Sequence, residues 1–141
     1  MMTSRRFTIH SLYLTLVASL LCVVLIGLTG CGASRGKALE FNGGELYYTK
    51  AVTEAEARKL GDYLVEGKFF DGTKKSAQLN KEGAAYEFRV VVKDGAEKDE
   101  QNAVLFQQIA QELSQNVFGG AAVNVHLCDA QLKTLRVITA Q

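Results

Sequence analysis

Two helix patterns, separated by segments of alternating polarity, constrain the fold of this chain more than any other feature. The first begins at Thr53 with the residues TEAE, a capping box in which the Thr53 hydroxyl and the Glu56 carboxylate satisfy free backbone amides. The second runs from Asp99 to Val117 with apolar residues at helical spacing, and a glycine pair follows it. Both patterns predict amphipathic helices that bury one face.

Five short segments show the alternation of half-buried strands, namely residues 45–50, 76–80, 84–93, 122–128 and 134–139. The order strand, helix, strand, strand, helix, strand is that of ferredoxin-like folds, here βαββαβ with an extra C-terminal strand. We therefore expect an α+β domain over residues 45–141. Right-handed crossovers would place its two helices on one face of an antiparallel sheet.

The N-terminal 30 residues have the three parts of an export signal. Arg5 and Arg6 lie in a segment without acids, residues 12–26 are apolar, and residues 27–30 are small enough for cleavage. An uncleaved membrane anchor remains an alternative, because residues 12–28 reach the short limit of a spanning helix, roughly 17 residues. The arginine pair also leaves twin-arginine export open beside general secretion.

The residues Leu28-Thr29-Gly30-Cys31 follow the apolar run directly and resemble the lipobox of bacterial lipoproteins. The resemblance implies that residues 1–30 are a cleaved lipoprotein signal peptide. It further implies that Cys31 carries diacylglycerol and an amino-terminal acyl chain such as palmitate. The protein would then be lipid-anchored in the cell envelope, on the outer membrane and facing the periplasm if its host has two membranes.

The segment after Cys31 is rich in glycine and has little apolar periodicity. We interpret residues 31–44 as the lipidated cysteine and a flexible tether that precedes the domain. Removing Arg5 and Arg6 from the formal net charge of +1 leaves −1 for residues 31–141. That balance argues against nucleic acid as a partner.

The sheet face opposite the helices is the predicted binding surface. It is expected to present Tyr47, Arg89 and His126, because side chains alternate between the two faces of a strand. Tyrosine and arginine are the residue types that most often anchor interfaces. We therefore predict a non-catalytic binding or scaffolding module whose partner is a protein or another component of the envelope.

Two other functions remain open. His126 and Cys128 lie on one face of a predicted strand, so an envelope enzyme or a metal-binding protein could use them. Neither a further ligand nor an orienting group is evident beside them, so we expect no catalytic residue, metal or cofactor. The third possibility is a structural subunit that associates with itself through its sheet edge.

Overall fold

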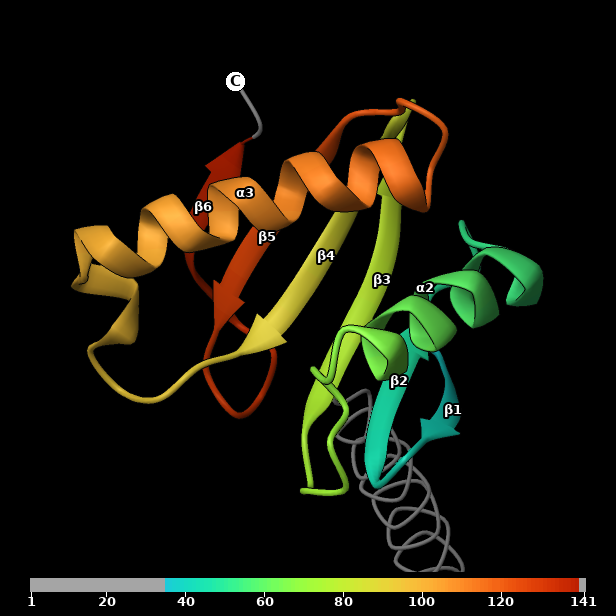
Figure 1. Ribbon diagram of the computed structural model, residues 1–141, viewed down its shortest axis with the longest axis horizontal. Coiled ribbons are helices and arrows are strands. Elements are labelled where there is room, and N and C mark those ends of the chain that lie inside the picture. Colours follow the sequence, from blue (N-terminus) through green and yellow to red (C-terminus); the bar gives the residue numbers. More distant parts are fainter. Residues whose placement is uncertain (1–34, 140–141) are drawn as a thin grey trace, which may run out of the picture. The chain divides into compact units, whose positions relative to one another are not determined.

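A computed structural model describes residues 35–139, which form an α+β domain (Figure 1). The predicted signal peptide and Cys31 lie outside the described residues. Within them, no helix is long and apolar enough to span a membrane. The elements are β1 (Lys37–Phe41), β2 (Gly44–Tyr48), α2 (Glu54–Glu66), β3 (Ser76–Glu82), β4 (Ala85–Val91), the short 3-10 helix η2 (Ala96–Lys98), α3 (Glu100–Asn116), β5 (Val123–Cys128) and β6 (Thr134–Thr139).

The six strands lie in one sheet in their order along the chain, β1 to β6. Three antiparallel hairpins, β1–β2, β3–β4 and β5–β6, alternate with two parallel pairs, β2–β3 and β4–β5. The α+β class and the two helices are confirmed, but the antiparallel sheet is wrong. Each helix connects strands that are direct neighbours, which makes the sheet mixed, so a ferredoxin-like arrangement is not confirmed.

The sheet has one more strand than predicted, because residues 37–48 form a hairpin. Asn42 and Gly43 both have positive φ angles, 41° and 82°, as a two-residue hairpin turn with this pair of residues requires. Leu39 lies opposite Leu46 and Phe41 opposite Gly44 in the resulting pair. The predicted flexible tether over residues 31–44 is therefore wrong from Lys37 onward, and the ordered domain begins before Glu45.

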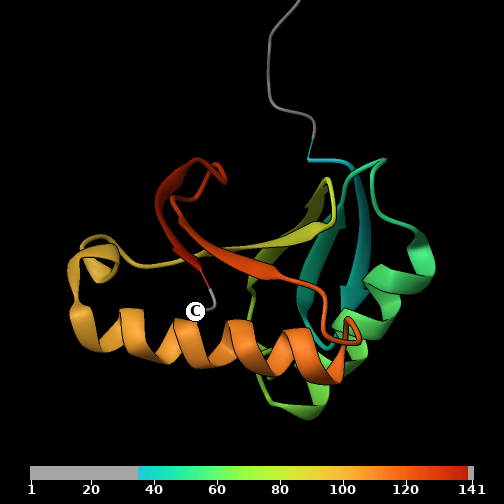
Figure 2. The ribbon, with the colours of Figure 1, turned by 90° about the horizontal axis from the view of Figure 1, so that it is seen from above.

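Both helices lie on the same side of the sheet, as predicted (Figure 2). α2 packs on β1 and β2, and α3 packs on β5 and β6. The strand residues that face the helices form the buried core together with apolar residues of both helices. The buried strand residues on this face are Leu46, Tyr48, Ala77, Leu79, Tyr86, Phe88, Val90, Val123, Val125, Leu127 and Ile138.

The predicted capping box starts α2. The Thr53 hydroxyl accepts from the amide of Glu56, and the Glu56 carboxylate accepts from the amide of Thr53 at 2.7 Å. The same carboxylate accepts from the Tyr86 hydroxyl of β4, and Lys81 lies 3.6 Å away. The hydrogen bonds from Tyr86 and Thr53 hold the pKa of Glu56 at about 2. The cap thereby fixes the start of α2 to the central strands.

Aromatic rings form a continuous set of contacts from β1 to β4. Phe41 stacks on Phe70 with ring centroids 6.1 Å apart, Phe70 meets Phe69 edge to face, and Phe69 meets Phe88 of β4 in the same way. Two glycines make room for these rings, because a Cβ atom at Gly44 would lie 2.0 Å from the Phe70 ring and one at Gly61 would lie 2.1 Å from the Phe41 ring. The rings join β1 to the middle of the sheet.

Replacing Gly61 by alanine tests the packing of β1 on α2. Helix propensity alone favours alanine by roughly 1 kcal/mol, yet the clash with Phe41 should lower the free energy of unfolding by about 1 to 3 kcal/mol. Urea denaturation of Gly61→Ala measures the sign. In the Phe41→Ala background the same change should become neutral or stabilising. A stabilising effect in the wild-type background would mean that Phe41 does not pack on this helix.

Candidate binding face

The open face is the side of the sheet that the two helices leave uncovered. One register row crosses five of its strands, with Tyr47 beside Gln78, Gln78 beside Arg89, Arg89 beside His126, and His126 beside Val137. The three predicted partner-binding residues, Tyr47, Arg89 and His126, therefore lie in a single row. Arg89 and His126 are direct neighbours, and Tyr47 is two strands from Arg89.

Glu87 is the acidic centre of this face and is 8% exposed. Its carboxylate accepts from the Asn80 side chain at 2.8 Å, and it lies 3.6 Å from Arg89 Nε and 3.7 Å from His126 Nε2. Burial raises the pKa of Glu87, but the Asn80 hydrogen bond and the charges of His126 and Arg89 outweigh it and leave the pKa below its ordinary value. A carboxylate ionised at neutral pH thus lies between two basic side chains.

Both ring nitrogens of His126 face polar side chains. Its Nδ1 lies 3.1 Å from the Thr134 hydroxyl of β6, while its Nε2 faces Glu87. Burial lowers the pKa of the imidazole, and the nearby Arg89 charge acts in the same direction, against the opposing effect of Glu87. The pKa of His126 thus lies below its ordinary value, which favours the neutral imidazole.

The centre of the open face is covered rather than solvated. The loop at residues 129–133 folds over it, since Arg89 Nη1 donates to the Leu132 carbonyl at 3.4 Å. From the other side, the Arg35 carbonyl accepts from Gln78 at 2.9 Å, and its guanidinium donates to the Ala130 carbonyl at 3.4 Å. These contacts leave Gln78 6% and His126 8% exposed. Sequence reasoning missed Arg35 because it lay in the assumed tether.

Tyr47 lies at the accessible end of the row. The Arg35 guanidinium carbon lies 5.6 Å from the centre of the Tyr47 ring, a cation–π contact, and the Tyr47 hydroxyl donates to Glu45 at 3.0 Å. At the opposite end Val137 is 47% exposed on the edge strand β6. A partner would thus meet Tyr47, Arg35 and Val137 directly, with Arg89 and His126 beneath the covering loop.

Cys128 is fully buried and its thiol donates to the backbone carbonyl of His126. Burial raises the pKa of this thiol. The imidazole of His126 is directed to Thr134 and Glu87, so the two side chains do not form a thiol–imidazole pair. In the described part of the chain, no group of three or more histidine, cysteine or acidic residues is arranged to hold a metal ion.

A family model described as a family N-terminal domain matches residues 38–140. The match covers well over half of the chain and includes both helices, β2 to β6, and β1 except its first residue. Its start within β1 agrees with a domain that includes the first hairpin. Neither a curated protein nor a solved structure matches the chain.

The buried imidazole predicts a pH dependence of stability. The pKa of His126 is lower in the folded domain than its ordinary value of about 6.5, so the unfolded chain binds this proton more tightly. The free energy of unfolding should therefore fall as the pH decreases from 7.5 to 5.5. Urea denaturation at several pH values measures this slope. His126→Gln should flatten it, and an unchanged slope in that variant would assign the effect to another group.

Proposed function

The chain belongs to the AF_1994_N family, and we propose that it is a membrane-anchored envelope lipoprotein whose domain binds a partner without performing chemistry. The row from Tyr47 to Val137 on the open face is the observation that carries the binding function. The lipobox at residues 28–31 supports the anchor, with the lipid on Cys31. In a host with two membranes the domain would face the periplasm from the outer membrane.

Cys31 and Arg35 are only four residues apart, and this short separation indicates where a partner of the open face would be found. Four residues span at most about 14 Å, and Arg35 contacts Gln78 and Tyr47 on the open face. With a lipid on Cys31, this end of the open face would lie close to the membrane surface. The partner is then an envelope component or a protein that reaches the bilayer.

The surroundings of His126 and Cys128 favour binding over catalysis. A nucleophilic thiol needs a lowered pKa and a base within hydrogen-bond reach. Here burial raises the pKa of the Cys128 thiol, and the imidazole is engaged by Thr134 and Glu87. In the proposed function, the side chains of His126 and Cys128 have a structural role and hold β4, β5 and β6 together.

The anchor is tested by intact mass spectrometry of the protein from its native membrane. The wild-type chain should begin at Cys31 and carry the mass of its acyl chains, whereas Cys31→Ala should be neither cut at this site nor lipidated. Two or more acyl chains are needed for stable anchoring, so this variant should lose lipid-dependent attachment. An unmodified Cys31 in the wild-type protein would contradict the proposal.

The binding face is tested with variants at its accessible end. Tyr47→Ser combined with Arg35→Ala should abolish cross-linking to the partner in intact cells. The folded domain should be retained, because Tyr47 and Arg35 lie outside the buried core. Leu105→Ser on the outer side of α3, where the side chain is 51% exposed, is the matched control and should cross-link as wild type does. Arg89 is unsuitable here, because its removal would leave Glu87 buried without its arginine.

Self-association through the sheet edge is a second candidate function, favoured by the sequence of β6. This edge strand exposes Leu135 and Val137, at 45% and 47%, and its one charged side chain, Arg136, turns to Glu100 of α3. The opposite edge strand, β1, carries exposed Lys37 and Glu40, which discourage pairing. An edge without charges facing outward can pair with a second copy.

Sedimentation of wild type and Val137→Lys distinguishes the two functions. If β6 pairs with a second copy, the wild-type protein should sediment as a dimer, and a lysine at position 137 should convert it to a monomer. Lys37→Gln at the other edge should leave the dimer unchanged. A wild-type monomer across the concentration range would remove this candidate.

A further inference from the structure

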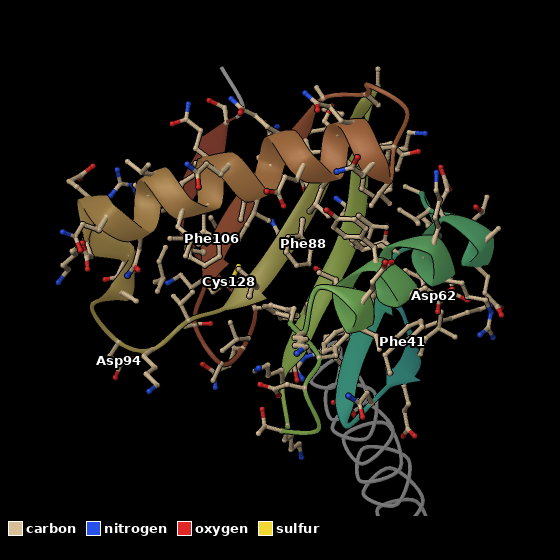
Figure 3. All side chains as sticks on the ribbon, viewed as in Figure 1. Phe41, Asp62, Phe88, Asp94, Phe106 and Cys128 are labelled. Carbon is tan, nitrogen blue, oxygen red and sulfur yellow. The ribbon has the colours of Figure 1, made fainter. Side chains whose placement is uncertain are left out.

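A cleft of about 490 Å³ lies at the carboxyl end of β4. Its apolar wall comes from Phe69 after α2, Val90 and Val92 at the end of β4, and Phe106 of α3. Figure 3 shows Phe106 below α3, on the side of that helix where β4 ends. This volume lies within the range of small-molecule sites, roughly 300 to 1,000 Å³.

The topology explains why the cleft is there. α2 covers β1 and β2, and α3 covers β5 and β6, so neither helix lies directly over the end of β4. The rings of Phe69 and Phe106 remain partly exposed although both touch the core. In open α/β sheets, ligands bind at the carboxyl ends of parallel strands, and this cleft lies at that end of the β4–α3–β5 unit.

Three lysines, Lys74, Lys75 and Lys93, line the cleft, and no acidic residue does. Lys75 is already engaged, because its ammonium donates to Asp71 and to the Phe69 carbonyl, each at 2.7 Å. Within the described residues, Lys74 and Lys93 have no carboxylate within 4 Å. An apolar wall thus adjoins two cations without ion-pair partners.

We propose that this cleft binds an amphipathic carboxylate, with an alkyl chain against the apolar wall and the carboxylate between Lys74 and Lys93. Lys74 and Lys93 are exposed, so a carboxylate near them gains an attraction that a neutral apolar ligand lacks. A hydrophilic anion would make no apolar contact with Phe69 and Phe106. Charge complementarity and apolar contact therefore both favour an amphipathic carboxylate as the ligand. Val91 and Ala130 also line the cleft, so it borders the loop that covers the open face. The inference does not depend on the lipid at Cys31.

Decanoate and decan-1-ol, which share a ten-carbon chain and differ in charge, are suitable probes below the micelle concentration of decanoate. Residues 35–141 form a compact unit, so a soluble chain starting at Gly32 can be used once its urea transition has been shown to be cooperative. Calorimetric titration should give decanoate an affinity about ten times that of decan-1-ol, a difference of about 1.4 kcal/mol. Amide and aromatic NMR shifts should change at Phe69 and Phe106.

Lys74→Gln combined with Lys93→Gln should reduce the decanoate affinity to that of decan-1-ol. The matched control is Lys50→Gln combined with Lys59→Gln, which removes the same charge from exposed positions outside the cleft and should bind decanoate as wild type does. Equal affinities for decanoate and decan-1-ol in the wild-type protein would overturn the proposal. So would equal losses in both double variants, or NMR shifts confined to the open face.

Discussion

The aromatic chain from Phe41 through Phe70 and Phe69 to Phe88 joins the two halves of this domain. Each half is a helix with the strands on which it packs, and the halves meet at the β3–β4 pair. The start of α2 also reaches β4 through the hydrogen bond from Tyr86 to Glu56. The three ring contacts add a side-chain link that ties the first edge strand to the middle of the sheet. Gly44 and Gly61 belong to the same arrangement, because side chains at these positions would displace the rings.

The same division leaves an incompletely covered region at the end of β4. The first turns of α3 extend past the core, so Ala103, Phe106 and Ile109 are partly buried, while Ala110, Leu113 and Val117 further along are fully packed. The apolar residues of α3 form one continuous stripe in the sequence, but the two halves of the helix have different surroundings. Its second half closes the core, and Phe106 in its first half also lines the cleft.

Local signals determined how much of this fold could be read from the sequence. The Thr53 capping box and the stripe of α3 depend on residues three or four apart, so both helices were predicted correctly. The alternation that puts Tyr47, Arg89 and His126 on one face is equally local. Strand order is not a local property. A strand has the same alternation of polar and apolar residues whether its neighbour in the sheet is parallel or antiparallel. The Asn42-Gly43 turn was a readable signal, but the surrounding glycines concealed the short strand before it. The contact between Arg35 and Ala130 joins residues 95 positions apart, and no sequence pattern predicts a contact of this kind.

The sequential strand order also bears on how the domain folds. Every strand pairs with the strand before or after it in the chain, and the widest separations are those across the two helices. Folding rates rise when contacts lie close in sequence, because less loop entropy must be lost before pairing begins. No strand has to insert between two others that are already paired. A chain synthesised from its amino terminus can therefore complete each pairing as soon as the next strand is available.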